Sequence, residues 1–295
     1  MESVENNNKI PLVSVVMITW NRKDLLRQVL GNLLRQTYRR YEVIIADNAS
    51  TDGTARMIKE EFPQVVFVQL KENCGIKGYN IALEHAHGEY VMIMDDDSFF
   101  EDEGIEKAVK KFQQFFMLGA LGCKVYNYYS KEVHYWHPTI REDDFSGQGF
   151  DSPLFNGCAA AARMSVLKEV GFYPEEFFLY ENERDLCTRI INAGYEVKYF
   201  TDISVYHMVL PEQGINKRRV FYATRNLIWY FWKYLPLRTA FGRTAFVVAL
   251  SVLSGIRKFA LITYLKPVGA AFCGLPKILR IRAPIKKKYI KKVLY

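Results

Sequence analysis

The chain has 295 residues, of which 49% are apolar and 24% charged, and its formal net charge is +8. These values predict one large domain or two ordinary ones with a sizeable core, and they exclude a disordered chain, a collagen-like repeat and a small disulfide scaffold. Five widely spaced cysteines without a C-x-x-C pair, and a polar start without the apolar run of a signal peptide, make a cytosolic protein the expectation.

Strands and helices are expected to alternate over the first 94 residues. Short apolar runs, three of them nearly continuous, predict buried parallel strands over residues 12–18, 41–46, 65–70 and 90–94. Helical spacing predicts helices over residues 23–36, between Asp52 and Pro63, and over residues 76–87. Short connections of this kind imply right-handed crossovers and a parallel sheet with helices on both faces.

Further strands and helices are expected up to residue 207. They are a helix near residues 104–116, a strand near 121–126, a strand and a helix within 155–172, a helix over 181–192, and two strands over 196–200 and 203–207. The stretch from residue 127 to 155 is rich in loops and aromatic residues. The helix over residues 181–192 should end at Gly194, because glycine readily adopts the left-handed conformation that follows many helices.

Three consecutive aspartates, Asp95, Asp96 and Asp97, follow the fourth strand. Ligands of parallel sheets bind beyond the carboxyl ends of the strands, and alternate residues of an extended segment share a face, so Asp95 and Asp97 can converge. Because clustered carboxylates repel one another, a divalent metal bound through oxygen, Mg²⁺ or Mn²⁺, is the natural occupant. The alternative is a solvated turn that caps a helix.

Other polar or small residues at strand and helix ends are also candidates. Asp47 directly follows the second strand, where it could accept hydrogen bonds from a nucleobase or a ribose hydroxyl, and Gly75 would let the backbone approach a ligand closely. Glu183 and Asp185 begin a predicted helix, either as first-turn charges or with one of them as a general base. His207 ends the last strand and is either structural or a third ligand for Mn²⁺.

Together these segments resemble the inverting family 2 glycosyltransferases with the GT-A fold, in particular their rhamnosyltransferase and galactofuranosyltransferase branch. "VSVVMITWNR" is similar to the family's first strand and nucleotide-binding turn, and "VIIADNASTDGT" to its V-D-N-x-S-x-D-G-T motif. "NCGIKGYNIALEHAHGEYVMIMDDD" and "LYENERDLCTRIINAGY" are similar to its N-x-G…L-D-x-D and E-D-x-D-L…A-G-Y motifs. The resemblance covers about residues 10–235 and implies an α/β fold of GT-A type, with a mostly parallel Rossmann-like sheet flanked by helices.

The resemblance also implies a binding site for the nucleotide of a sugar donor. Its residues would be Thr19, Asn21, Asp47, Asp52, Gly75, Asn80, Asp95, Asp96 and Arg225. Asp47 would contact the nucleobase in a pocket lined by Thr19 and Asn21, and Asp95 would lie near the ribose. Arg225 would neutralise the departing diphosphate.

A metal site and a catalytic base are implied in the same way. The metal ligands would be Asp97, Asp95 and His207, which would hold Mn²⁺ or Mg²⁺. The base that accepts the acceptor's proton would be Glu183, which stands where the family usually has an aspartate. Asp185 or Glu181 could take its place.

Charge is divided unevenly between the two parts of the chain. Residues 1–212 hold 22 Lys and Arg against 32 Asp and Glu, a net charge of −10, whereas residues 213–295 hold 18 Lys and Arg and no carboxylate. The apolar run over residues 244–254 falls short of the ~20 residues of a spanning helix, and residues 235–271 alternate apolar blocks with single cations as interfacial helices do. We expect a flexible N-terminus over residues 1–10, a catalytic domain over 11–212 and a basic, helical, membrane-surface region over 213–295.

The predicted function is therefore metal-dependent, inverting transfer of a sugar from a nucleoside-diphosphate sugar to a cell-envelope or lipid-linked glycan. The protein is expected to be cytoplasmic and peripheral on the inner face of the cell membrane. One alternative is a sugar-phosphate nucleotidyltransferase, although the glycine-rich loop of that class is missing after the first strand. Another is a basic nucleic-acid-binding protein, but the acidic first part of the chain argues against a nucleic acid partner.

Overall fold

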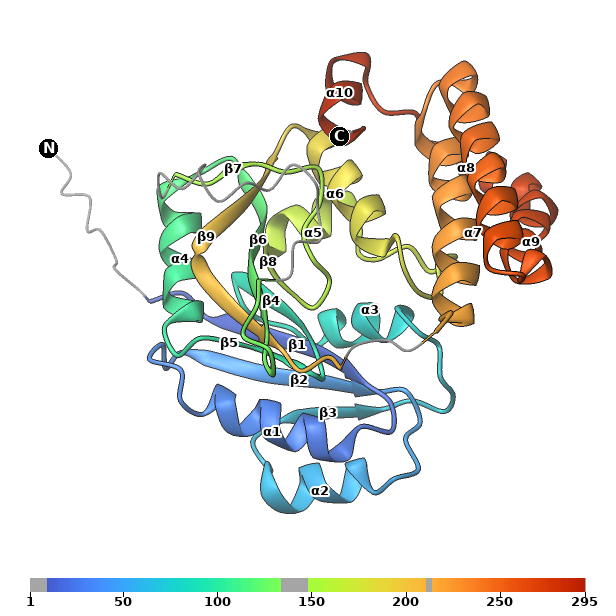
Figure 1. Cartoon of the computed structure of the whole chain (residues 1–295). Coiled ribbons are helices and arrows are strands. Elements are labelled where there is room, and N and C mark those ends of the chain that lie inside the picture. The colour runs from blue at the N-terminus through green and yellow to red at the C-terminus, as the bar shows by residue number, and fades with distance from the viewer. Residues whose placement is uncertain (1–9, 134–147, 211–213, 295) are drawn as a thin grey trace, which may run out of the picture.

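The computed structural model describes residues 10–133, 148–210 and 214–294, which build layers of helices around one sheet (Figure 1). Residues 1–9 of the predicted flexible terminus and residues 134–147 of the loop-rich stretch lie outside this description. The strands are β1 (Val13–Thr19), β2 (Tyr41–Asp47), β3 (Val66–Gln69), β4 (Tyr90–Asp95), β5 (Ser98–Phe100), β6 (Leu118–Asn127), β7 (Phe150–Asp151), β8 (Ala159–Arg163) and β9 (Glu196–His207).

Helices alternate with the strands of the first part and then dominate the last part of the described chain. They are α1 (Lys23–Leu33), α2 (Thr54–Glu61), α3 (Lys77–Glu84), α4 (Gly104–Gln114), α5 (Met164–Val170), α6 (Asn182–Ala193), α7 (Lys217–Tyr234), α8 (Leu237–Arg257), α9 (Leu261–Arg280), the 3₁₀ turn η1 (Lys287–Tyr289) and α10 (Ile290–Val293). Gly194 follows α6 in the left-handed conformation, as predicted.

Four parallel strands form one half of the sheet, in the order β3-β2-β1-β4, which confirms the prediction for the first 94 residues. The register pairs Thr19 with Asp47 and Ile18 with Asp95, so β1, β2 and β4 end at the same level. The loops that follow these strands therefore share one edge of the sheet, and the polar residues predicted as a binding site come from those loops.

The other half of the sheet is mixed. Strand β8 runs antiparallel to β4 and β6, and β6 is parallel to β9. The two strands predicted over residues 196–200 and 203–207 are one strand, β9, because a shift of register opposite Cys123 and Lys124 absorbs the residues between them. The short strand β5 was not expected; it follows Asp97 directly and pairs with the end of β9, so that Ser98 lies opposite His207.

Two hydrophobic clusters fill the two faces of the sheet. Alternate residues of β1 point to opposite faces, so Val15 and Met17 join the cluster under α1, α2 and α4, whereas Val16 joins the cluster under α3, α5 and α6. Both clusters consist of fully buried side chains such as Leu26 and Leu186. The sheet is thus held rigidly from both sides, which keeps its polar edge in a defined geometry.

The last three long helices form a separate layer at one side of the molecule, away from α4 (Figure 1). Helices α7, α8 and α9 enclose a third cluster together with Phe177, which precedes α6 in the chain. The chain then returns to the sheet, where Ile285 and Val293 are buried in the cluster under α6. The predicted division at residue 212 stays a prediction.

Helix α8 corrects the expectation about its apolar run. Residues 244–254 do not stand alone but lie within a helix of 21 residues that contains an 18-residue apolar window with a mean hydropathy of 1.5, and only 22% of this window is buried. By length and composition α8 is the one candidate membrane span among the residues that the structure describes, and a single helix of this kind is weak evidence. Whether α8 crosses a membrane depends on how it is attached to the neighbouring helices.

Candidate active site

The carboxylates that follow β4 are held in place by the neighbouring strands. Asp95 is the last residue of β4, and its backbone N–H donates to the carbonyl of Cys158 at 3.1 Å. The Tyr79 hydroxyl donates to the Met94 carbonyl at 2.6 Å and also lies 3.1 Å from Asp95 Oδ1. The chain then turns into β5, whose pairing with β9 brings His207 to Asp97. The His207 Nε2 lies 3.2 Å from Asp97 Oδ1.

The structure brings together the three predicted metal ligands, Asp95, Asp97 and His207. One possible ligand atom from each lies within 4.8 Å of the others. Two buried atoms of the group, Asp97 Oδ1 and His207 Nδ1, have no hydrogen-bond partner among the described residues. Carboxylate oxygens and an imidazole nitrogen are ligands that Mn²⁺ accepts, so these residues fit a divalent cation. Tyr79, which sequence reasoning missed, orients one of them.

Arg22 occupies the open side of the aspartate group and was also missed. Its Nη1 lies 2.9 Å from Asp96 Oδ1 and 2.7 Å from Asp97 Oδ2, and its side chain is 47% exposed. Thr19 donates to the other oxygen of Asp96 at 2.8 Å, so this predicted donor-binding residue is held by protein contacts. The parallel pairing of β1 and β4 offered a signal, because it places "TWNR" beside "DDD".

Burial and mutual repulsion perturb the three aspartates differently. Burial raises the pKa of Asp95 to about 7, helped by the charge of Asp97, and burial raises the pKa of Asp96 to about 6 although Arg22 opposes it. Burial also acts on Asp97 and would raise its pKa, but the adjacent His207 imidazole and then the Arg22 guanidinium outweigh burial and lower the pKa. Burial alone would lower the pKa of His207, but the negative charge of Asp97 outweighs burial, and the pKa is raised. The three aspartates together therefore carry less than their full negative charge near neutral pH.

The loops after β1 and β2 are tied into one wall. Asp47 is fully buried, and its Oδ1 accepts from the Ser50 hydroxyl at 2.5 Å; burial raises its pKa. Asn21 has a φ of 52°, accepts from the Thr51 N–H at 2.7 Å, and donates its own N–H to Ser50 Oγ at 2.8 Å. The predicted pocket residues Thr19, Asn21 and Asp47 thus come from adjacent strand ends, and their contact with a nucleobase stays a prediction.

The Asp52 carboxylate accepts hydrogen bonds from the first backbone N–H groups of two helices, α1 and α2. Its Oδ2 accepts from the Lys23 N–H at 2.9 Å, and its Oδ1 accepts from the Thr54 N–H at 3.1 Å. The capping position of α2 is held by Gly53, which has a φ of 88°. These bonds lower the pKa of Asp52 against the effect of burial. They give Asp52 a structural role, and the geometry lends no support to donor binding.

Gly75 and Asn80 likewise serve the protein's own packing. A Cβ atom on Gly75 would lie 2.3 Å from the carbonyl oxygen of Phe178, and the residue has a φ of 61°. The close approach expected of a ligand is therefore made by the loop before α6. The amide of Asn80 donates to the Tyr173 carbonyl at 2.9 Å and accepts from its N–H at 2.8 Å. Both residues fix α3 to the segment between α5 and α6.

Glu183 lies in the first turn of α6, behind two residues of positive φ, Tyr180 and Glu181. Burial raises its pKa to about 7, and its only hydrogen-bond donor among the described residues is its own backbone N–H. A Cβ atom on Gly157 would lie 2.3 Å from Glu183 Oε1, so the backbone there is close to the carboxylate. The charge of Glu183 also raises the pKa of Asp95, which places the two groups within electrostatic reach.

The two competing carboxylates are engaged in ion pairs. Asp185 is fully buried and accepts from Lys233 Nζ at 2.7 Å, the Tyr234 hydroxyl at 2.8 Å and Arg189 Nε at 2.8 Å. Glu181 accepts from Arg184 Nε at 2.5 Å. Asp185 therefore anchors α7 to α6, and its catalytic role stays a prediction.

Arg225 projects from α7 into a group of aromatic rings. Its guanidinium carbon lies 4.2 Å from the ring centre of Trp229 and 4.9 Å from that of Tyr222, and burial lowers its pKa. The buried Nη2 has no hydrogen-bond partner among the described residues. The adjacent Asn226 donates to the carbonyls of residues 179 and 180 at 2.7 and 2.9 Å, so α7 borders the loop that carries Glu183.

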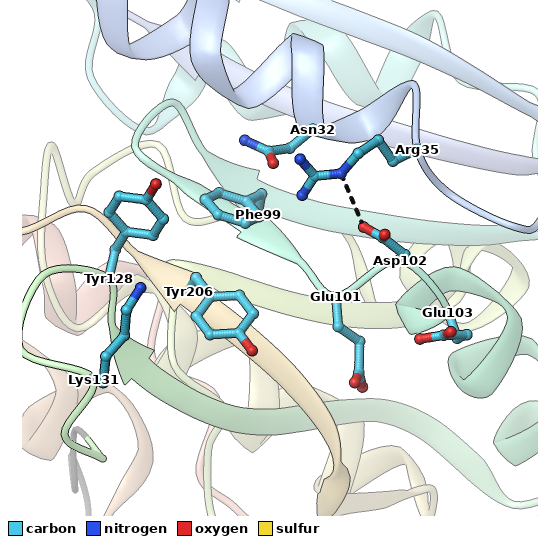
Figure 2. A pocket seen from close by; sticks show the side chains of 9 residues that line it. All are labelled: Asn32, Arg35, Phe99, Glu101, Asp102, Glu103, Tyr128, Lys131 and Tyr206. Atoms are coloured by element: carbon cyan, nitrogen blue, oxygen red, sulfur yellow. Dashed lines mark hydrogen bonds and ion pairs between the residues drawn. The ribbon is translucent and has the colours of Figure 1, made fainter.

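A hollow of about 480 Å³ lies elsewhere, over β5 and the end of β9 (Figure 2). Figure 2 shows Phe99, Tyr128, Lys131 and Tyr206 around it. The Lys131 Nζ lies 4.2 Å from the centre of the Tyr128 ring. Tyr206 precedes His207 in β9, and neighbouring residues of a strand point to opposite faces. The hollow therefore lies behind the metal ligands and contains none of the predicted site residues.

Comparison with known proteins identifies the family of this site. The family model described as glycosyl transferase family 2 matches residues 14–171. A relative of Bacillus subtilis, the teichuronic acid biosynthesis glycosyltransferase TuaG, is 35% identical over 105 residues, 34% of this chain and 41% of its own length. The glycosyltransferase GlyA of Streptococcus pneumoniae is 29% identical over 227 residues, 74% of this chain and 29% of its own length. The matches thus span less than half of both relatives.

Solved structures with the same fold come from an archaeon and a bacterium. The mannosyltransferase PcManGT of Pyrobaculum calidifontis, solved with GDP-Man and Mn²⁺, has a TM-score of 0.61 and 23% identity, covering 92% of this chain and 79% of that one. S. aureus TarS 1-349 with UDP-GlcNAc has a TM-score of 0.61 and 16% identity, covering 91% and 83%. At these identities the likeness concerns the fold, and it confirms the predicted GT-A type.

Proposed function

Because the chain belongs to glycosyl transferase family 2, we propose that it is a metal-dependent, inverting glycosyltransferase that uses a nucleoside-diphosphate sugar as donor. The observation that carries the proposal is the convergence of Asp95, Asp97 and His207 at a sheet edge that Glu183 also borders. Family membership favours this reaction over sugar-phosphate nucleotidyl transfer and over nucleic-acid binding. Sugar transfer by the family needs a donor site, a charge-neutralising centre and a base, and each has candidate residues here.

A divalent cation, Mn²⁺ or Mg²⁺, would be held by Asp95, Asp97 and His207. When bound, it neutralises the negative charge that develops on the departing nucleoside diphosphate. Arg22, half exposed beside Asp96 and Asp97, adds a fixed positive charge at the same place. Thr19, Asn21 and Asp47 would form the wall that receives the nucleobase. Mn²⁺ in the PcManGT structure supports a metal of this kind without deciding between the two ions.

Glu183 would act as the general base. A carboxylate with a pKa near 7 is a stronger base than an exposed one, and it is still substantially ionised at neutral pH. It would take the proton of the acceptor hydroxyl as the oxygen attacks the anomeric carbon on the face opposite the leaving diphosphate. Attack from that face inverts the configuration of the sugar.

The acceptor would be a cell-envelope or lipid-linked glycan. The relative named for teichuronic acid biosynthesis supports a polymer of this kind. We also propose that residues 11–212 form the catalytic domain and that residues 213–295, with 18 cations and no carboxylate, keep the protein at the inner face of the cell membrane.

The test is donor binding and donor turnover. Calorimetry with UDP-, GDP- and dTDP-sugars should find one that binds with Mn²⁺ and loses most of its affinity with EDTA. Asp97→Asn should weaken Mn²⁺-dependent binding at least about tenfold, because it removes a charged ligand. Asp24→Asn is the matched control, since Asp24 is 83% exposed and, in the described part of the chain, pairs only with Arg27. Metal-independent binding, or an unchanged D97N variant, would contradict the metal site.

A further inference from the structure

The α8–α9 pair carries an unusual share of exposed apolar surface. Of the 21 large apolar side chains that are exposed among the described residues, 12 lie within residues 237–281. The most exposed are at the turn between the two helices, where Phe259 is 99% and Ile262 82% exposed. On the rest of the described chain such residues are scattered, as on ordinary soluble proteins. The concentration of exposed apolar side chains on α8 and α9 therefore indicates an interaction site.

The two faces of α8 have the reverse of the usual composition. Its buried face consists of small residues, Ala240, Thr244, Ser251 and Gly255. Its exposed side includes Phe246, Leu250, Leu253 and Ile256, each at least 46% exposed. A helix of a soluble protein buries its large apolar residues and exposes its polar ones. An inverted helix of this kind indicates an apolar environment outside the protein.

Charge decides which partner fits. Residues 237–281 contain seven Lys and Arg and no carboxylate, and two of the cations, Arg257 and Lys258, directly precede Phe259 at the turn. A second copy of the chain that paired through this same surface would bring the same positive charge against it and be repelled. An anionic lipid bilayer supplies both the opposite charge and an apolar interior, so it satisfies both features.

The attachment of α8 favours a helix that lies on the bilayer over one that crosses it. The Trp232 Nε1 donates to Thr244 Oγ1 at 3.0 Å, and the Trp229 Nε1 donates to the carbonyl of Ala271 in α9 at 2.9 Å. Both tryptophans belong to α7, whose Lys233 is paired with Asp185 of α6. Placing α8 across the bilayer would therefore draw charged groups of α7 into the hydrocarbon, which is costly.

We propose that α8 and α9 form a docking surface that lies on an anionic membrane, with Phe259 and Ile262 of the turn inserted below the headgroups. The inference deepens the proposed function, on which it rests for the lipid-linked nature of the acceptor. Helix α7 joins this surface to the active site: Asn226 holds the loop before Glu183, and Lys233 holds α6. Docking would thus present Glu183 at a fixed height above the membrane, where the head of a lipid-linked acceptor lies.

The experiment is cosedimentation of the full chain with vesicles of phosphatidylcholine containing 30% phosphatidylglycerol (on the order of a third anionic lipid). The double variant Phe259→Ser/Ile262→Ser should bind at least about tenfold more weakly, since two apolar side chains no longer enter the bilayer. Lys258→Glu should weaken binding roughly fivefold or more, and added salt should abolish the difference. Phe116→Ser is the matched control, because Phe116 is 84% exposed on the opposite part of the fold and should not matter.

Several outcomes would overturn the docking proposal. Equal sedimentation of the double variant and the parent would do so, as would binding that resists alkaline carbonate extraction, which indicates a spanning helix. A concentration-dependent dimer of the parent that the double variant loses would assign the surface to a second copy. Donor turnover in detergent-free buffer separates the two proposals: the double variant should keep it, whereas its absence in the parent would refute the proposed function alone.

Discussion

Replacing Glu183 by glutamine removes an ionisable group that the fold largely shields from water. Burial raises the pKa of this carboxyl from 4.5 to about 7, so the folded chain binds the proton more tightly than the unfolded chain. Stability must therefore fall as the pH rises from about 4.5 to about 7, where the folded protein begins to carry a poorly solvated charge. Glutamine is neutral at every pH and does not bear this cost.

The expected size of the effect follows from the two pKa values. At about 1.4 kcal/mol for each pKa unit, their difference corresponds to about 3 kcal/mol. Urea unfolding in EDTA should find Glu183→Gln more stable than the parent by about 1 kcal/mol at pH 5 and by about 3 kcal/mol at pH 8. Glu72→Gln, which changes an exposed glutamate, should show no such dependence on pH.

The same variant separates stability from catalysis. Without a base, Glu183→Gln should lose sugar transfer at least about 100-fold while its donor affinity stays unchanged. In the parent, kcat/KM should rise with pH up to about 7, because the protonated carboxyl cannot accept the acceptor's proton. A stability difference that is the same at pH 5 and pH 8 would refute the burial argument, and unimpaired transfer would refute the role as base.

Three further substitutions test the roles that the fold assigns. Asp185→Ala should cost about 3–5 kcal/mol of unfolding free energy, because Arg189 loses its ion pair and the buried Lys233 keeps only Glu176 among the described residues; a fully stable but inactive variant would instead favour catalysis by Asp185. Asn80→Ala should cost about 1–3 kcal/mol through its lost bonds to Tyr173, and a weaker donor affinity at full stability would revive the predicted binding role. Tyr79→Phe should weaken Mn²⁺ binding about 10-fold or more in calorimetry, and an unchanged Kd would separate Asp95 from the metal site.

Local pattern predicted the parallel half of the fold and its polar edge. The apolar runs that became β1, β2 and β4 are long enough to define strands, and each is followed at once by the residues of a candidate site. A strand that is buried on both faces has few alternatives, so its position follows from composition alone. The family motifs added the family but not the role of each residue within them.

Tertiary contacts decided which motif residues face the site. Asp52, Gly75 and Asn80 lie in the same motifs as Asp47 and Asp95, yet their partners are backbone groups of the protein itself. Such bonds join segments up to 93 residues apart, which no local pattern encodes. The pairing of β5 with β9 belongs to the same class, because three residues are too short for a recognisable strand signal.

The sequence by itself therefore determined the order of strands and helices up to residue 94, the acidic turn after β4 and the basic composition of the last 83 residues. Only the tertiary structure decided that Arg22 contacts the aspartates, that Asp185 forms an ion pair with α7, and that α8 exposes its large side chains. The physical reason is that the spacing of apolar residues and the residue types in turns determine structure only over a few neighbouring residues. The partner of a buried charge, or the exposure of an apolar face, depends on what the distant chain brings beside it.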